Sequence, residues 1–286
     1  MIVIVESGAT KTDWCSVSES GKVLNVRTAG INVAVMPVEA VREIIAAATA
    51  GLNPENEKVS QVHFYAAGLI ASPGETVPAS AAKLHGILSG YFPEAGMEYA
   101  SDLLAAARAV CGHGPGIAAI LGTGSNSCFF DGEKVVKNVR SAGFILGDEG
   151  GAACLGKLFM ADFLKGLVPE PVSSEFASEF NVDYLTVVQN VYKSPAPSKY
   201  LGDFAPWILQ RYDSCEYVRG LVEQNFRNFI ERALKQYDIV NYPVGVVGSY
   251  GYHNQAVLRK VASEYGIRFS EIIPAPIDGL VKYHRL

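Results

Sequence analysis

The sequence has no excess of basic charge and no long apolar segment. Its 24 lysine and arginine residues and 29 aspartate and glutamate residues give a net charge of −5, and neither half is basic. This balance argues against a protein that binds nucleic acid or an anionic membrane. No apolar run approaches the roughly 20 residues that cross a bilayer. The short apolar run before Glu6 has no basic residues ahead of it, unlike a signal peptide, so we expect a cytoplasmic protein.

Disulfide and metal patterns are also missing. The five cysteines are widely spaced and form no Cys-x-x-Cys pair, which predicts buried free thiols. The five histidines show no metal-ligand spacing, so we predict no zinc site and interpret them as structural or surface residues. Glycine is abundant instead, with 28 in 286 residues, which indicates tight turns or close approaches of the backbone.

Residues 2–30 and 117–143 share one pattern. Each begins with an apolar strand, followed by a polar glycine turn, a second strand, a tight hairpin turn and a third strand. Near its end, Val26-Arg-Thr-Ala-Gly30 matches Val139-Arg-Ser-Ala-Gly143 at an offset of 113 residues. The period is too long for a solenoid. The repeat therefore predicts a duplicated α/β domain with a pocket between the copies.

The length of 286 residues suits two domains, which we place at residues 1–113 and 114–286. The second contains a helical insertion, and a terminal helix at about 272–286 packs back on the first. Apolar periodicity predicts the other helices, at 38–50 (closed by Gly51), 79–90, 149–167, 173–191, 217–237 and 254–265.

The turn from Glu6 to Thr12 can hold phosphates. It offers backbone N–H groups at Gly8, the hydroxyls of Thr10 and Thr12, and Lys11. It lacks the Gly-Lys-Ser/Thr of a P-loop, so an ordinary hairpin stays an alternative. A second glycine turn, Gly122-Thr-Gly-Ser125, occupies the matching place in the repeat, which favours a pair of phosphate-binding turns.

Asp102 follows a predicted strand and precedes a predicted helix. Ser101 or Asp102 caps that helix on the simplest interpretation. A catalytic role is compatible with capping, because ligands of α/β folds bind at the ends of strands.

Two further glycine motifs have alternative interpretations. Gly143, Gly147, Gly150 and Gly151 surround an acidic pair, Asp148-Glu149. These acids either complement a helix dipole or, at Asp148, accept hydrogen bonds from sugar hydroxyls, with the glycines admitting the ligand. The segment 245–249 is either a strand–helix turn or a flat surface for adenosine.

Taken in order, these motifs resemble those of the sugar kinase/actin/heat-shock ATPase superfamily. More narrowly, the chain is similar to N-acetylglucosamine kinase-like proteins of the BadF/BadG/BcrA/BcrD ATPase family. The motifs are Val5–Asp13, Gly30-Ile-Asn32, Ala66-Ala-Gly68, the Asp102 element, Leu121–Asn126, Gly147-Asp-Glu-Gly150 and, least well matched, Val247-Gly-Ser249.

The resemblance implies two ribonuclease-H-like domains of the actin-like ATPase type that close over ATP and substrate in a cleft. It implies ATP-dependent phosphorylation of an amino sugar, N-acetylglucosamine to its 6-phosphate, with Mg²⁺ as cofactor. The implied partners are then a small-molecule sugar and ATP, and neither nucleic acid nor a membrane is expected as a partner. Whether the chain forms a homodimer is left open. Asp102 is the implied general base. The implied sugar ligands are Asn32, Gly68, Gly124, Asn126 and Asp148; those of ATP are Gly8, Thr10, Lys11, Thr12, Gly122, Thr123, Gly248 and Ser249.

The chain departs from the family at Glu6, where the usual residue is aspartate. That carboxylate helps to hold Mg²⁺, often through water, and glutamate is one methylene longer. Two alternatives therefore stay open: a sugar or nucleotide sensor with weak turnover, and a BadF-type ATPase that activates a dehydratase or reductase. The second requires cysteine ligands for an iron–sulfur cluster, for which Cys128 and Cys154 are the candidates.

Overall fold

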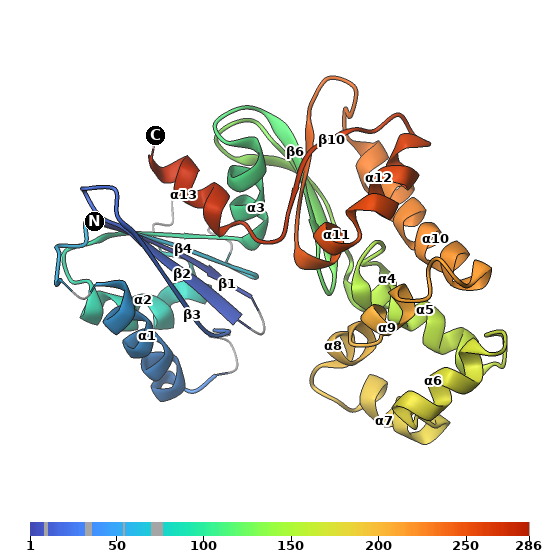
Figure 1. Cartoon of the computed structure of the whole chain (residues 1–286). Helices are drawn as coiled ribbons and strands as arrows, with labels where there is room; N and C mark the ends of the chain where they lie inside the picture. Colours follow the sequence, from blue (N-terminus) through green and yellow to red (C-terminus); the bar gives the residue numbers. More distant parts are fainter. Residues whose placement is uncertain (9–10, 32–35, 54, 70–76, 286) are drawn as a thin grey trace. The chain divides into compact units, whose positions relative to one another are not determined.

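The repeat predicted from the sequence takes the form of two five-stranded sheets in a computed structural model that describes residues 1–8, 11–31, 36–53, 55–69 and 77–285. In each sheet the first three strands are antiparallel, and two later strands run parallel to the first. This confirms the predicted class of two ribonuclease-H-like α/β domains. The sheet orders are β3-β2-β1-β4-β5 and β10-β9-β6-β7-β8 (Figure 1).

The first sheet comprises β1 (Ile2–Ser7), β2 (Lys11–Val17), β3 (Val23–Ala29), β4 (Gln61–Ala66) and β5 (Gly96–Ala100). The second comprises β6 (Gly116–Leu121), β7 (Ser125–Phe130), β8 (Val135–Val139), β9 (Val244–Val247) and β10 (Phe269–Ile273).

The two copies also agree in register. Val26 pairs with Trp14 in the first sheet and Val139 pairs with Ser127 in the second, so each partner is displaced by the same 113 residues. The first hairpin turn is one residue longer, because Ser7 pairs with Thr12 whereas Leu121 pairs with Ser125. The sequence match therefore marks equivalent positions in the two sheets.

The chain divides into two units. Unit 1 contains Met1–Gly114, Gly132–Lys134 and Ala275–Leu286, and unit 2 contains Pro115–Asp131 and Val135–Pro274. The terminal helix α13 (Ile277–Arg285) packs on strands β1 and β2 and on the helix α3 (Asp102–Cys111) of unit 1. It begins later than the sequence indicates, because residues 272 and 273 still belong to β10.

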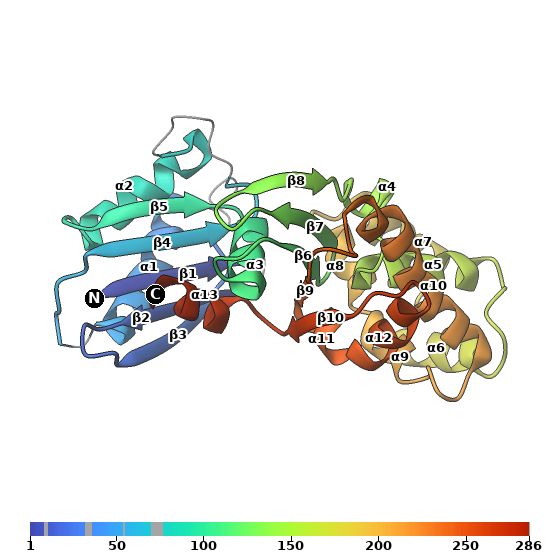
Figure 2. The ribbon, with the colours of Figure 1, turned by 90° about the horizontal axis from the view of Figure 1, so that it is seen from above.

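Helices cover both faces of the sheet of unit 1 (Figure 2). The helices α1 (Val38–Leu52) and α2 (Ala82–Tyr91) share a core with Val3 and Val5, whereas the opposite face, with Ile4, packs against α3 and α13. Strand β1 is buried on both faces, which explains its unbroken apolar sequence. Gly51 lies inside α1, which continues to Leu52. A Cβ at Gly51 would lie 2.8 Å from Val26 Cγ2, so the glycine lets the helix approach β3.

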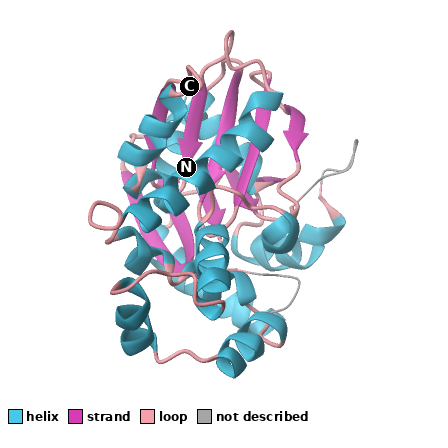
Figure 3. Ribbon diagram, turned by 90° about the vertical axis from the view of Figure 1, so that its right-hand side faces the viewer, coloured by secondary structure: helices cyan, strands magenta, loops and turns pink. Residues whose placement is uncertain are grey.

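Unit 2 carries the helical insertion (Figure 3). A single helix expected at 173–191 is two helices, because Asn181 adopts a left-handed conformation with φ 46°. The long helix ends at Arg232 rather than 237. The helices are α4 (Gly143–Leu146), α5 (Ala152–Leu164), α6 (Val172–Phe180), α7 (Tyr184–Tyr192), α8 (Pro197–Gly202), α9 (Ala205–Leu209), α10 (Glu216–Arg232), α11 (Ser249–His253) and α12 (Gln255–Ser263).

The core of the insertion is aromatic. Phe176 lies 4.9 Å from Phe159, 5.4 Å from Phe204 and 5.1 Å from Trp207 between ring centroids, each in an edge-to-face arrangement. Cys15, Cys128 and Cys154 are buried, whereas Cys111 and Cys215 are partly exposed, so the predicted burial holds for three of the five cysteines. Within the described ranges, no helix is long and apolar enough to cross a membrane.

Candidate active site

The turn between β1 and β2 is closed by its own polar groups. The Gly8 amide donates to the Lys11 carbonyl at 2.9 Å. The Ser7 and Thr12 hydroxyls lie 2.8 Å apart, and Ser7 Oγ accepts from the Ile31 amide at 3.1 Å. Sequence reasoning missed the role of Ser7. Thr12 is predicted to bind phosphate, but it is fully buried and its hydroxyl bonds to Ser7 within the turn. Two other predicted ligands, Thr10 and Asn32, lie outside the described residues.

Carboxylates gather beside this turn. Glu6 and Asp13 are paired across β1 and β2, and Asp13 forms ion pairs with Lys11 Nζ at 3.3 Å and Arg27 Nε at 2.6 Å. Burial raises the pKa of Glu6 to about 7. The nearby carboxylates of Asp13 and Asp102 also raise it, and Lys11 lowers it. Unit 1 therefore concentrates negative charge around Glu6.

Asp102 is the first residue of α3, and Ser101 is the cap. Ser101 Oγ accepts from the Leu104 amide at 3.1 Å, which satisfies one of the free N–H groups of the first turn. Asp102 Oδ1 accepts from the Leu103 amide at 2.8 Å. Burial raises the pKa of Asp102, although the Leu103 amide opposes that rise. The capping role therefore falls on Ser101 and leaves Asp102 a carboxylate of increased basicity.

Gly68 follows β4 in a tight turn. Its φ is +80°, and the Leu69 amide donates to the Ala66 carbonyl at 3.3 Å. Positive φ at the third position of a four-residue turn is typical of type II, which favours glycine. The turn accounts for this glycine without a ligand.

The glycine turn between β6 and β7 and the helix α5 hold each other. The Ala152 amide donates to the Gly122 carbonyl at 3.0 Å, and the Ala153 amide donates to the Thr123 carbonyl at 2.8 Å. Helix α5 has no side-chain cap, so carbonyls of the turn satisfy its first N–H groups. This fixes the conformation of the turn that is predicted to bind phosphate.

Asp148 lies against the same turn. Its Oδ1 accepts from the Ser125 amide at 3.2 Å, and a Cβ on Gly124 would lie 2.8 Å from its Oδ2. Asp148 has a left-handed φ of 57° and is 9% exposed. Burial raises its pKa, and the Ser125 amide opposes this. The structure thus brings together two residues, Gly124 and Asp148, that the sequence predicts to bind sugar.

The glycines around Asp148 are required by contacts within the protein. A Cβ on Gly147 would lie 1.9 Å from the Ser141 carbonyl oxygen, and one on Gly151 would lie 2.8 Å from that of Thr123. On Gly150, whose φ is +79°, it would lie 2.7 Å from Phe229 Cβ. The sequence interpretation attributed this crowding to a ligand, whereas these three close approaches are to the chain itself.

The adenosine motif packs on the same part of unit 2. Gly248 has a φ of +128°, and a Cβ there would lie 2.3 Å from the Leu121 carbonyl oxygen. Its amide donates to the Ile273 carbonyl at 2.9 Å, and Ser249 begins α11. Leu121 also lies beside Gly150 and Gly251. Three motifs separated in sequence therefore converge on the end of β6.

Asn225, buried in α10, ties the acidic motif to the core and was missed by sequence reasoning. Its Oδ1 accepts from the Gly150 amide at 2.9 Å, and its Nδ2 donates to the Gly151 carbonyl at 3.1 Å. The side chain is fully buried. An amphipathic stripe gives no signal for such a residue, because its role depends on a loop 75 residues away.

We expect Asn225→Ala to destabilise unit 2. The change leaves the Gly150 N–H and the Gly151 carbonyl without partners in a buried site, which costs about 1–3 kcal/mol for each such group. Urea denaturation measures the loss. Asn228→Ala is the matched control on α10, because Asn228 accepts from Gln224 at the partly exposed surface. Equal midpoints for the two variants would contradict the assigned role.

A groove of about 420 Å³ lies beside these motifs in unit 2. Asn126 lines it, and its Oδ1 accepts from the Ser127 amide and from Asn138 Nδ2, both at 2.9 Å. Glu149 and Arg232 form an ion pair of 2.7 Å on its wall. Its size lies within the range of about 300–1,000 Å³ that is typical of small-molecule sites.

The cysteines proposed for an iron–sulfur cluster are placed unfavourably. Cys128 is fully buried and Cys154 is 4% exposed. A cluster shared between subunits requires thiolates that reach the surface, and burial raises the pKa of Cys154. The structure gives no support to an activator of that type.

Comparison with solved structures identifies similar proteins. A proposed N-acetylglucosamine kinase from Porphyromonas gingivalis is 36% identical, with a TM-score of 0.88, over 99% of this chain and 98% of that one. A second, from Chromobacterium violaceum, is 16% identical with a TM-score of 0.73 over 99% and 98%. A proposed N-acetylmannosamine kinase from Listeria monocytogenes is 15% identical with a TM-score of 0.53 over 99% and 97%.

The last two likenesses show a shared fold only. Neither a family model nor a curated protein matches the chain. The first likeness extends over almost the whole of both chains at an identity that establishes common descent. The chain therefore belongs to the N-acetylglucosamine kinase-like family of the sugar kinase/actin/heat-shock ATPase superfamily.

Proposed function

We propose that the protein transfers the γ-phosphoryl group of ATP to an amino sugar, N-acetylglucosamine, at its 6-hydroxyl. The observation that carries the proposal is the glycine turn placed at the same point of both sheets, after β1 and after β6. The similarity to a proposed N-acetylglucosamine kinase supports the choice of sugar.

ATP is assigned to the two turns and the adenosine motif. We assign the phosphates to the turns that contain Gly8 and Gly122-Thr-Gly124. The amides of Gly8 and Gly122 bond within their own turns, so the phosphate oxygens are assigned to the remaining backbone N–H groups of these turns and to the ammonium of Lys11. Lys11 is 44% exposed although it is paired with Asp13, so its ammonium remains accessible. The turn at Gly248 and Ser249, between β9 and α11, is assigned to adenosine from the motif resemblance.

The sugar is assigned to Gly124, Asn126 and Asp148 beside the groove of unit 2. Carboxylate and amide oxygens accept hydrogen bonds from sugar hydroxyls. Asp102 accepts the proton of the attacking hydroxyl. Burial raises the pKa of Asp102, which makes it a stronger proton acceptor than an exposed aspartate.

The residues beside the first turn fit Mg²⁺. Asp13 Oδ2 is buried, and among the described residues its polar neighbour is Lys11 Nζ, at an ion-pair distance of 3.3 Å rather than in a hydrogen bond. Burial and the nearby carboxylates of Asp13 and Asp102 raise the pKa of Glu6. Hard oxygen ligands of this kind suit Mg²⁺, which usually retains several waters. We assign the metal to Glu6, through water. When bound, Mg²⁺ neutralises charge on the phosphoryl oxygens.

A coupled assay of ADP release tests the proposal, with N-acetylglucosamine, N-acetylmannosamine and glucose as acceptors. We expect sugar-dependent turnover with kcat of about 1–100 s⁻¹, greatest with N-acetylglucosamine, and phosphate on the 6-oxygen by NMR. ADP release that does not depend on sugar would favour the ATPase alternative. Tight calorimetric binding of ATP and sugar without any product would favour the sensor.

A further inference from the structure

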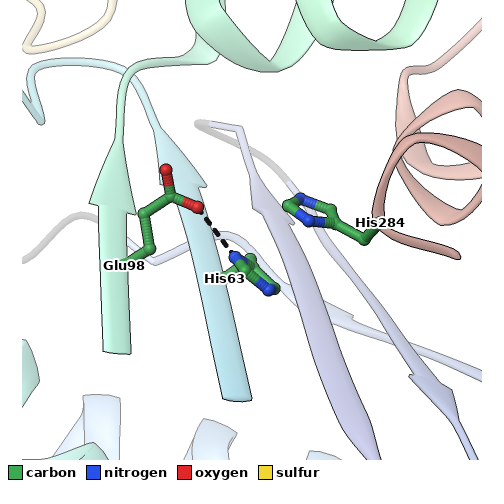
Figure 4. A group of neighbouring side chains, drawn as sticks. All are labelled: His63, Glu98 and His284. Carbon is green, nitrogen blue, oxygen red and sulfur yellow. Dashed lines mark hydrogen bonds and ion pairs between the residues drawn. The ribbon is translucent and has the colours of Figure 1, made fainter. Parts of the chain in front are cut away.

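A partly buried cluster of charged and aromatic side chains joins the terminal helix α13 to the sheet of unit 1. His63 projects from β4, Glu98 from β5 and His284 from α13 (Figure 4). Arg108 of α3 and Tyr65 of β4 complete the group. We call these five residues the His284 cluster.

The hydrogen bonds of the cluster suit a neutral His284. Arg108 donates to the Tyr65 hydroxyl at 2.6 Å, because a guanidinium only donates. The Tyr65 hydrogen can then point at His284 Nε2, which lies 2.7 Å away. We assign this bond to a neutral imidazole that carries its hydrogen on Nδ1 and accepts at Nε2, because the guanidinium beside it disfavours a second positive charge.

His63 and Arg108 lie beside His284. Its ring stacks on His63 with centroids 3.7 Å apart, and His63 Nδ1 lies 2.7 Å from Glu98 Oε2. Burial, with smaller contributions from His63 and Arg108, lowers the pKa of His284 to about 3. Hydrogen bonds from His63 and Arg108 hold the pKa of Glu98 at about 2, although burial opposes them.

The other charged neighbours do not reverse the lowering of the His284 pKa. Glu98 raises the pKa of His284, but its charge is balanced by Arg108, its partner at 2.8 Å. His113 lowers that pKa further. Among the described residues, the groups that shift the pKa of His284 are His63 of β4, Glu98 of β5, Arg108 of α3 and His113 after α3. The rings of Tyr65 on β4 and Tyr283 on α13 lie beside it.

Two histidines and a glutamate also suggest a metal site, but the geometry opposes it. A metal binds in the plane of each imidazole, about 2.0–2.1 Å from its nitrogen. The ring planes here are stacked 3.7 Å apart and inclined by only 23°, so no point satisfies both rings. The cluster is better explained as a contact that fastens α13.

Helix α13 in turn holds the helix that begins at Asp102. It crosses α3 so closely that a Cβ on Gly279 would lie 2.6 Å from the Ala109 carbonyl oxygen. Arg108, six residues after Asp102, reaches Tyr65 and Glu98 and lies 5.0 Å from the Tyr283 ring. We propose that α13 positions Asp102 through α3, and that it docks only when His284 is neutral. The catalytic part of this inference rests on the proposed function.

The expected pH dependence has a definite sign. The docked state binds fewer protons than the undocked state, whose histidine has a pKa near 6.5. Docking is therefore unaffected above pH 6.5 and weakens progressively as the pH falls from 6.5 toward 3. At pH 5 the docking equilibrium constant is lowered about 30-fold.

Hydrogen exchange of the whole protein tests docking without reference to activity. After correction for intrinsic rates, amides of α13 should exchange about 30-fold faster at pH 5 than at pH 8. His284→Gln should abolish this difference, because the amide oxygen accepts from Tyr65 and never carries a charge. His284→Lys should show fast exchange even at pH 8. His85→Gln is the control, since His85 contacts Tyr99 on the other face of the sheet.

Activity then tests the link to Asp102. With the sugar kinase assay, His284→Lys should lower kcat at pH 8 with little change in KM for ATP, and His284→Gln should remove part of the acidic loss of kcat. Exchange of α13 that is equal at both pH values, or that responds to added Zn²⁺ instead of pH, would overturn the proposed docking. Fast exchange in His284→Lys with unchanged kcat would overturn the positioning role alone.

Discussion

Replacement of Asp102 by asparagine is expected to lower kcat by about 10²- to 10⁴-fold, the usual contribution of a general base. The asparagine oxygen can still accept from the Leu103 amide, so the start of α3 is retained. KM for ATP and for the sugar should change little, because the lost interaction belongs to the proton that moves during transfer. The coupled ADP assay measures both constants.

Ser101→Ala provides the matched control for this substitution. It removes the cap bond to the Leu104 amide and should lower the free energy of unfolding by about 1 kcal/mol. Its kcat should stay within a few-fold of the wild type. Full activity of Asp102→Asn would show that another group takes the proton.

Removal of the Glu6 carboxylate is expected to increase the Mg²⁺ concentration for half-maximal activity by about 10- to 100-fold, as for other groups that hold a metal through water. Glutamine keeps the length of the side chain and removes the charge. Without Mg²⁺, Glu6→Gln should also melt at a higher temperature than the wild type at pH 8, because it removes a carboxylate that burial and its acidic neighbours disfavour. Magnesium titration and thermal unfolding measure the two effects.

Two further variants sharpen this experiment. Glu6→Asp restores the residue usual in the family and should keep the Mg²⁺ requirement near that of the wild type. Glu19→Gln removes a carboxylate from an exposed turn and should alter neither property. An unchanged Mg²⁺ requirement in Glu6→Gln would contradict the assignment of the metal to this residue.

The sequence predicts the duplication well because equivalent strands have kept recognisable residues. Val26 and Val139 lie at the same register of their sheets, so residues that match in sequence also occupy equivalent positions in strand pairing. Helix ends were harder to predict. Asn181 interrupts a periodic apolar pattern by adopting a left-handed backbone, a choice that packing of the insertion determines.

Contacts between distant segments could not be predicted. Asn225 bonds to a loop 75 residues away, and Tyr65 to a histidine 219 residues away. Neither pair has a local signature, because the partner is set by how the elements pack. The glycines show the opposite problem. Their positions were correctly singled out, but Gly147 and Gly151 accommodate the protein's own carbonyls.

The return of α13 to unit 1 has a consequence for biosynthesis. The strands and helices up to α3 are made first, but the surface formed by Ile4, Cys15, Tyr65 and Ala105 waits for Leu280 and Val281. At translation rates of about 5–20 residues per second, the intervening chain takes on the order of 10–30 s to emerge. During that time an apolar face is open to chaperones and to other nascent chains. A ribosome that stalls before residue 277 leaves the N-terminal half unfinished, however complete its sheet.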